Sequence, residues 1–266
     1  MKALRFVMGI TFLICFLYMP LSVVSSEAKE TKTQIPDYVI NISKDNTYHS
    51  PVEKNKNRKA NEMTKGILEK SGVETDNPFF IQLLNKSQMK NAPFAIGYQA
   101  KIYLGEWPIR YESKDTNLNW YYQKVNTNYL DNREGIRTAR MSYYQEVQKD
   151  VKGGITTYVN KVEDVQEMML LCAEKKTGLP LSFDTIIGGA TRGAGVYHVP
   201  AKCLGYLTAY VPAVHEEGMV TYAKVYLQLK GNQRRIVLED EETKKVSAWI
   251  PVENHIAFGF DYRGVK

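Results

Sequence analysis

The sequence predicts an α+β fold: a β-rich, largely antiparallel sheet with two or three helices packed on it. Between Ala92 and Leu104, apolar and polar residues alternate with a period of two, which is the pattern of a half-buried strand. Short loops separate this strand from the strand-like segments that follow, and such loops favour antiparallel hairpins. The chain also has 18 Tyr and 3 Trp, residues more typical of strands than of a helical bundle.

Three segments carry helix signals. Asn61–Lys70 has apolar residues at helical spacing on one face. A second helix is predicted to begin at Asn77, where a capping residue is followed by Pro78 at the first helical position. The third, Val162–Lys176, has acidic residues in its first turn and lysines in its last, and Gly178 ends it.

The rest of the sequence predicts many short strands. The first strand is expected to break at Gly105–Pro108, and a second is expected over Leu118–Leu130. His215–Gly218 is expected to form a polar turn between two later strands. Adjacent carboxylates there, Glu216 and Glu217, are therefore expected to be solvated. No internal repeat is visible between residues 90 and 266.

The first 26 residues resemble a secretory signal. Lys2 and Arg5 precede an apolar run, Phe6–Met19, which is followed by Pro20 and small residues. We expect residues 1–26 to be a signal peptide, 27–60 a polar, partly flexible leader, and 61–266 a single α+β domain. Within the leader, an edge strand is expected at Tyr38–Ile42. The chain is then extracytoplasmic, either secreted or on the cell surface.

The alternative is that the N-terminal segment is not cleaved. A spanning helix needs about 20 predominantly apolar residues, and Phe6–Val24 approaches that length, although Pro20 and Ser22 interrupt it. In that case the protein is anchored in the membrane by its N-terminus. Membrane contact is expected only through such an uncleaved segment.

Composition and motifs exclude several classes of function. The formal charge is +6, or +4 once Lys2 and Arg5 are removed with the signal, an ordinary charge for solubility that predicts no nucleic-acid partner. The glycine run Ile187–Gly195 lacks the Lys of a phosphate-binding loop. His215 begins a zinc-like motif, but residue 219 is Met where the second His is needed. The sequence thus predicts no cofactor, no metal site and no catalytic residue.

Aromatic residues form the one candidate binding site. In the strand Leu118–Leu130, Trp120 and Tyr122 point to one side and Tyr121 and Tyr129 to the other. An exposed row of aromatic rings stacks on sugar rings or on a partner chain. We take Trp120 and Tyr122, beside Trp107, as the candidate binding residues, with burial of both rows as the alternative.

Two cysteines remain after the signal, Cys172 and Cys203. Export permits a disulfide between them. Cys172 also shares a helical face with apolar residues, which is typical of a buried free thiol. The sequence leaves both possibilities open.

Six motifs resemble the YfkD-like family of exported proteins from spore-forming Gram-positive bacteria. They are NISKDNTY (41–48), PFAIGYQAKIYLGEWP (93–108), NWYYQKVNTNY (119–129), VKGG (151–154), KCLGY (202–206) and AWIPV (248–252). The resemblance extends over nearly the whole chain after the signal. It implies an exported protein and carries over no catalytic residue.

These observations favour a non-enzymatic, envelope- or spore-associated binding or structural protein, with cell-wall polymer or another envelope protein as its partner. The alternative is an exported hydrolase whose active site is assembled from residues distant in the sequence. A flat aromatic surface favours the first function, and a deep pocket with converging titratable groups favours the second.

Export gives the first prediction. Fractionation of cells that express the full-length chain is expected to place the product outside the cytoplasm, because the signal directs it across the membrane. N-terminal sequencing is expected to find Glu27 or Lys29 as the first residue, since a small-x-small cleavage pattern precedes each. A cytosolic product that begins at Met1 contradicts this prediction.

Overall fold

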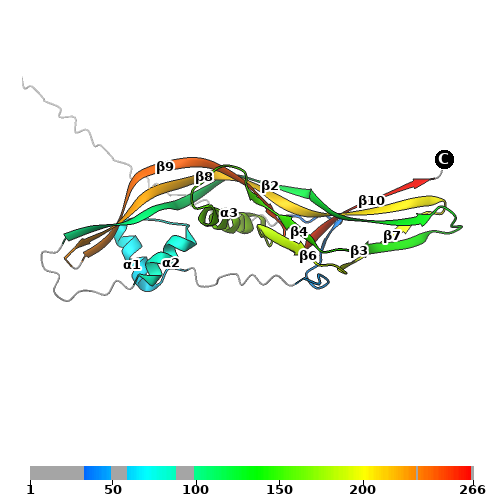
Figure 1. Ribbon diagram of the computed structural model, residues 1–266, viewed down its shortest axis with the longest axis horizontal. Helices are drawn as coiled ribbons and strands as arrows, with labels where there is room; N and C mark the ends of the chain where they lie inside the picture. Colours follow the sequence, from blue (N-terminus) through cyan, green and yellow to red (C-terminus); the bar gives the residue numbers. More distant parts are fainter. Residues whose placement is uncertain (1–32, 49–58, 88–98, 232, 265–266) are drawn as a thin grey trace, which may run out of the picture.

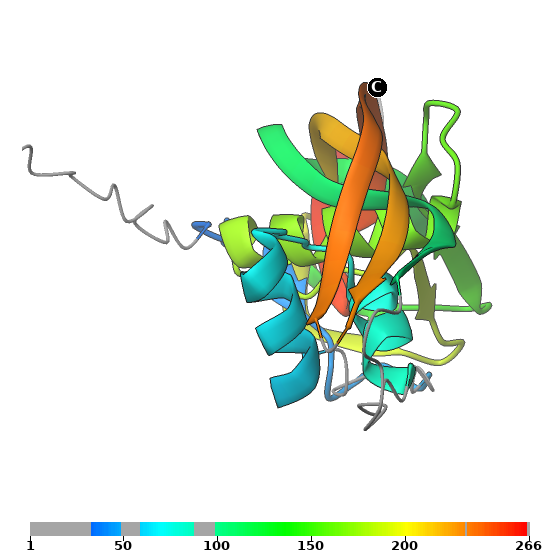
Figure 2. The same cartoon turned by 90° about the vertical axis from the view of Figure 1, so that its left-hand side faces the viewer.

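The chain forms an elongated body built on one long, twisted sheet (Figure 1). The end view shows β2 and β9 running in clearly different directions, which reflects the twist of the sheet (Figure 2). All strand pairs are antiparallel, so the predicted β-rich α+β class is confirmed. In this computed structural model, the described residues are 33–48, 59–87, 99–231 and 233–264.

The central strand of the sheet is β8 (Cys203–Lys230). One of its edges pairs with β2 (Gln99–Asn132) along nearly its full length. Its other edge pairs with β10 (His255–Gly264) over the first part of the strand and with β9 (Gln233–Pro251) over the rest. β10 and β9 thus pair with successive parts of the same edge of β8.

Two short strands extend the sheet at its edges. β1 (Val39–Asn41) pairs with β10, and β5 (Gly154–Ile155) pairs with β9. The predicted edge strand near Tyr38 is therefore present. Ile42, next to β1, is fully buried, so residues 33–48 are part of the folded body, whereas the sequence assigned them to the leader.

Three helices and two small sheets pack on the long sheet (Figure 1). Their bounds are α1 (Glu62–Ser71), α2 (Pro78–Lys86), α3 (Val162–Thr177), β3 (Ala139–Tyr144) with β7 (Arg192–Val199), and β4 (Lys149–Lys152) with β6 (Asp184–Ile187). The three predicted helices are confirmed within a residue or two of the expected bounds where bounds were given.

Three hydrophobic clusters lie between these elements and the long sheet. The α1–α2 cluster packs these helices on the end of the sheet formed by β2, β8 and β9, with Phe80 fully buried. The α3 cluster lies in the middle, where Val165 and Met169 meet Val220 and Ile250. The small-sheet cluster fills the other end and is centred on Tyr143. Burial of each large apolar side chain stabilises the fold by about 1.5–3 kcal/mol.

Asn77 connects the first two clusters. Its Oδ1 accepts hydrogen bonds from the backbone amides of Phe79 (2.8 Å) and Phe80 (3.1 Å), so it caps α2 as predicted. Its Nδ2 donates to the carbonyl of Pro108 and to Oδ2 of Asp164, both at 2.8 Å. One fully buried side chain thereby joins α2, β2 and α3.

The expected strand breaks are wrong. Gly105 and Pro108 lie inside the continuous β2, because β-bulges beside each of them absorb the irregular backbone. His215–Gly218 lies inside β8, where both neighbouring strands pair with it: Glu216 is opposite Thr116 on β2 and Ala248 on β9. Polar residues in a row favour a turn, but pairing on both edges keeps this segment in the strand.

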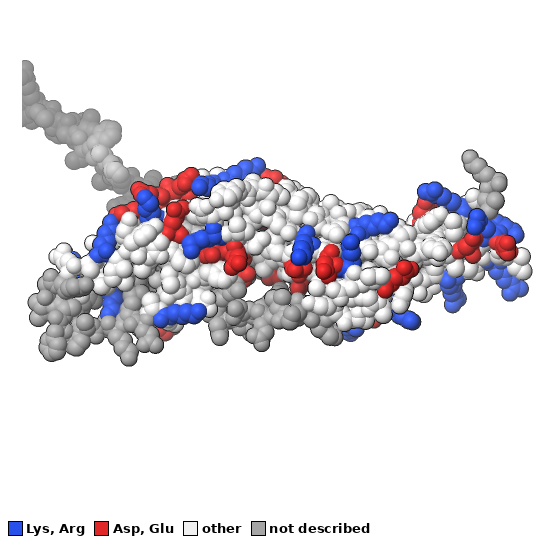
Figure 3. All heavy atoms as spheres, in the orientation of Figure 1, with Lys and Arg blue, Asp and Glu red and all other residues white. Residues whose placement is uncertain are grey.

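The predicted signal peptide, residues 1–26, and part of the leader lie outside the described residues. Among the helices that the structure describes, none combines the length and apolarity needed to cross a bilayer. In the view of Figure 3, charged residues of both signs lie along the body, and Lys and Arg gather at the end where β10 finishes.

Asn77→Ala is expected to destabilise the protein by about 2–4 kcal/mol, because it removes a helix cap and leaves buried partners without hydrogen bonds. The matched control is Asn61→Ala, which removes the exposed cap of α1 and is expected to cost about 1 kcal/mol. Urea unfolding of the two variants and the parent chain measures both. Equal losses for the two variants contradict the role of Asn77 as a junction.

Candidate binding surface

We call the side of the long sheet opposite the small-sheet cluster the outer face. Along the first part of β8, Leu207, Ala209 and Val211 point into the small-sheet cluster. Because side chains alternate along a strand, the intervening Tyr206, Thr208 and Tyr210 lie on the outer face, where they are half-buried. Strands held on both edges give this face a rigid backbone.

Three tyrosines from separate strands form a stack across the outer face. The rings of Tyr38 and Tyr121 are parallel within 10° with centroids 5.5 Å apart, and Tyr210 meets Tyr121 edge-on at 5.2 Å. Tyr38 precedes β1, Tyr121 belongs to β2 and Tyr210 to β8. Since β10 and β8 lie between β1 and β2, the rings bridge the width of the sheet. We call these three residues the tyrosine stack.

Small residues of β10 lie beside the tyrosine stack. Ala257 is the register partner of Tyr210, and a Cβ on Gly259 would make an ordinary van der Waals contact with the Tyr210 ring at 3.8 Å. The Tyr121 side chain is 46% exposed although it contacts two other rings. Desolvation and the neighbouring Tyr38 raise the pKa of Tyr121, so its hydroxyl stays neutral near pH 7.

Polar groups surround the tyrosine stack. Lys124, an exposed cation, is the register partner of Tyr210. The hydroxyls of Thr127 and Thr208 lie 3.2 Å apart in the next register pair on the same side of the sheet. The surface therefore presents apolar ring faces beside hydroxyl and ammonium groups, which is the combination that stacks on a sugar ring and bonds its hydroxyls.

The three aromatic residues singled out from the sequence are not brought together. Trp107 packs on the α1–α2 cluster, Trp120 on the α3 cluster and Tyr122 on the small-sheet cluster, and all three are half-buried. Phe80 and the Lys161 ammonium, 3.6 Å from the ring centroid, hold Trp107. Tyr122 stacks on Trp249 at 5.1 Å. The described contacts of these rings are those of packing residues.

The exposed aromatic row is the opposite one. Tyr121 and Tyr129 are the exposed members of the segment, and Tyr129 is 73% exposed. Alternation correctly separated Trp120 from Tyr121, but it gave no sign of which side the helices cover. Tyr38 lies 83 positions earlier in the chain and is separated from β2 by β10 and β8, so the sequence did not identify it as a neighbour of Tyr121; the only signal was the short edge strand beside it.

Comparison with known proteins identifies the family. The model of the YfkD-like proteins matches residues 36–264. The chain belongs to the YfkD-like family. A YfkD-like relative from Bacillus subtilis (strain 168), described as "Uncharacterized protein YfkD", is 47% identical over 227 residues, which cover 85% of this chain and 86% of the relative. The resemblance predicted from the sequence motifs is confirmed.

A buried carboxylate lies under the middle of this YfkD-like sheet. Glu216, expected to be solvated, is fully buried and accepts hydrogen bonds from the hydroxyls of Tyr111 (2.8 Å) and Thr116 (2.6 Å). Burial, followed by the charge of Glu216, raises the pKa of Tyr111 well above its usual range. Since Glu216 has no exposed surface, it cannot touch a dissolved substrate, and we assign the group to structure.

The two cysteines of the YfkD-like chain are free thiols in the structure. Cys172 packs on the α3 cluster, whereas Cys203 packs on the small-sheet cluster at the end of the molecule. The disulfide left open by the sequence is therefore not formed here, because the partners sit in different clusters. Burial and the nearby Glu216 raise the pKa of Cys172, which makes it a weaker nucleophile.

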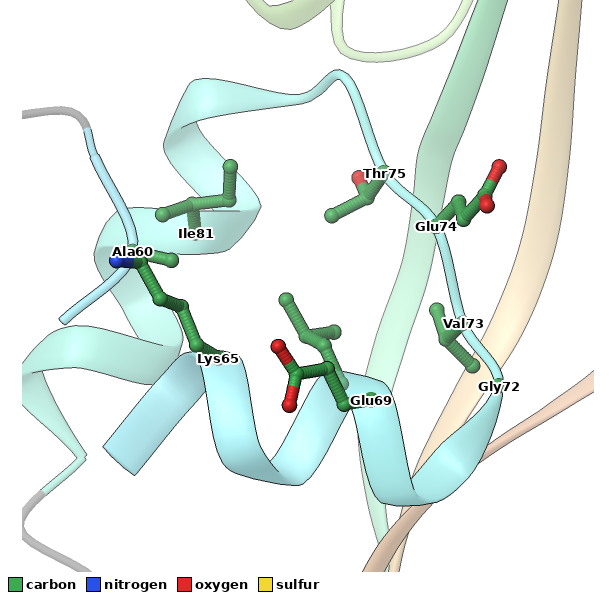
Figure 4. Close-up of a pocket in the computed structure, with 9 residues that line it drawn as sticks. Ala60, Lys65, Glu69, Gly72, Val73, Glu74, Thr75 and Ile81 are labelled. Carbon is green, nitrogen blue, oxygen red and sulfur yellow. The ribbon is translucent and has the colours of Figure 1, made fainter. Parts of the chain in front are cut away.

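An open hollow of about 540 Å³ lies between α1, α2 and the segment that joins them (Figure 4). Glu69 extends into it from α1, and Thr75 and Ile81 line the opposite wall. Its described lining has no Ser, His or Cys, and its polar side chains are those of Lys65, Glu69, Glu74 and Thr75. Within the described residues, no group of three or more His, Cys, Asp or Glu is arranged to hold a metal ion.

Neighbouring substitutions in β2 test these assignments. Trp120→Ala is expected to destabilise the protein by about 2–3 kcal/mol, because it removes contacts with the α3 cluster. Tyr121→Ala, one residue along, is expected to cost less than about 1 kcal/mol, since its ring lies on the exposed outer face. Urea unfolding monitored by circular dichroism gives both values. A larger loss for Tyr121→Ala reverses the assignment of the two rows.

Proposed function

We propose that this YfkD-like chain is an exported, non-enzymatic protein of the cell envelope or spore that binds cell-wall polymer through its outer face. The observation that carries the proposal is the tyrosine stack: three rings from separate segments that contact one another on the outer face, with Tyr38 and Tyr121 exposed and Tyr210 half-buried. The N-terminal signal expected from the sequence supports export.

The geometry suits a weak, repeated contact. Each stacked ring contributes about 0.5–1.5 kcal/mol beyond area burial, so the tyrosine stack alone supports low affinity for one sugar unit. An extended polymer offers many equivalent units, and binding of several copies along it raises the overall affinity without new contacts. The rigid strands under the rings keep the entropic cost of binding low.

An exported hydrolase remains the second candidate only through the hollow between α1 and α2. Glu69 and Glu74 are its acidic lining residues. Glycan hydrolysis needs two carboxyl groups that face each other across the scissile bond. In Figure 4, Glu69 extends into the hollow while Glu74 points away from it, so the arrangement favours binding over hydrolysis.

Tyr121→Ala is expected to weaken binding to purified, insoluble cell-wall material about tenfold, because two ring contacts and the platform between them are lost. The matched control is Tyr158→Ala, a tyrosine that is 93% exposed and lies outside the sheet. Co-sedimentation over a range of wall concentrations measures the affinities.

Unchanged binding by Tyr121→Ala rejects the outer face as the site, and an equal loss in Tyr158→Ala rejects its specificity.

The supernatants of the same assay separate the two candidate functions. Soluble sugar fragments that accumulate with time in the presence of the parent chain indicate hydrolysis, and their release favours the second candidate.

A further inference from the structure

One end of the molecule combines features that the tyrosine stack does not explain. Asn132 of β2, Cys203 of β8 and Gly264 of β10 lie side by side where these strands meet the end of the body. The segments 133–138, between β2 and β3, and 200–202, between β7 and β8, form its outermost loops. We call residues 131–140, 200–202 and 261–264 the tip.

A single buried side chain fixes both loops of the tip. The Asn132 amide donates to the carbonyls of Arg137 (3.0 Å), Val199 (3.1 Å) and Pro200 (2.9 Å). Its backbone carbonyl accepts from the amides of Gly135 and Lys202. A Cβ at Gly135 would lie 1.8 Å from Oδ1 of Asn132, so only glycine fits there. These hydrogen bonds fix both loops, so their exposed side chains are held in defined positions.

The held loop presents an apolar side chain to solvent. Ile136 is 87% exposed at the outer turn of the tip, and Tyr262 at the end of β10 is half exposed. Loop residues at such turns are normally polar. A large aliphatic group held outward on a fixed loop is suited to entering an apolar medium.

The tip also carries several cations. Arg137, Arg140 and Lys202 are exposed, and none of the three has an acidic partner within the described residues. Arg133 and Arg263 add positive charge but are matched by Asp131 and Asp261. Figure 3 shows the gathering of Lys and Arg at this end. Three unmatched cations against Glu134 leave the tip positive.

We propose that the tip docks on an anionic lipid bilayer, with Ile136 inserted at the headgroup boundary and Arg137, Arg140 and Lys202 on the lipid phosphates. Charge alone fits any anionic polymer, but an exposed isoleucine contributes only where there is an apolar phase to enter. This contact is separate from the predicted N-terminal segment and from the tyrosine stack. It gives the protein a peripheral membrane contact at one end of its long axis.

The test uses the purified chain, without residues 1–26, and sedimented vesicles. Binding is expected to vesicles of phosphatidylcholine mixed with phosphatidylglycerol, to weaken as salt is raised, and to be absent with phosphatidylcholine alone. Ile136→Ser is expected to weaken binding about tenfold, and Arg137→Gln or Lys202→Gln about fivefold each. None of these changes touches a buried partner, and circular dichroism confirms that each variant is folded.

Two substitutions far from the tip serve as controls. Val147→Ser removes an equally apolar side chain that is 73% exposed in another loop, and Lys86→Gln removes an exposed cation at the end of α2. Both are expected to bind like the parent chain. Absence of vesicle binding, or unchanged binding by Ile136→Ser, overturns the proposal. Equal binding of parent and Ile136→Ser to a soluble polyphosphate, with no vesicle binding, assigns the tip to an anionic polymer instead.

Discussion

Hydrogen bonding on both edges of β8 is the constraint on which the rest of the structure depends. β2 takes one edge, while β10 and β9 share the other, and each covering element packs on the sheet that this pairing creates. The junction falls at Val211–Val214, four consecutive buried residues where β10 gives way to β9. Odd-numbered Leu207 packs in the small-sheet cluster before the junction, whereas even-numbered Val214 and Val220 pack in the α3 cluster beyond it.

The same pairing explains how a buried charge is tolerated. Glu216 lies on β8 between Val214 and Val220 of the α3 cluster, and its carboxylate is fully buried. Hydroxyls of Tyr111 and Thr116 replace the lost hydration. A buried charge costs more than it returns unless its partners are well placed. The sheet therefore holds β2 and β8 in one register at this point, because a slip would separate the carboxylate from both donors.

Local signals in the sequence were sufficient for the helices and for the fold class. Asn61 and Asn77 cap α1 and α2, and glycine ends α1 and α3, because capping depends on residues within a few positions of each other. The length of β2 was not predictable in this way. Gly105 and Pro108 are ordinary signals of a break, and only pairing with β8 through bulges carries the strand past them.

The binding surface was half predictable for a related reason. A period of two assigns Trp120 and Tyr121 to opposite sides, but which side is covered depends on where distant segments fold back. Helix α3 and the small sheets decide it for β2, and of these only β3 follows that strand closely in the sequence. The contact between Tyr38 and Tyr121 likewise depends on the topology and not on a local pattern. The same holds for the five strand ends that meet at the tip.

The irregular hydrogen bonding of β2 also governs how copies of the molecule meet. Among the described residues β2 pairs only with β8, so one edge of a 34-residue strand is left without a partner strand. A long regular edge of this kind recruits a second chain and nucleates fibres. Five register shifts bend it, and Pro108 and Lys114 interrupt it. The residues at these bulges made the strand hard to recognise in the sequence. The same bulges act against edge-to-edge polymerisation at high local concentration.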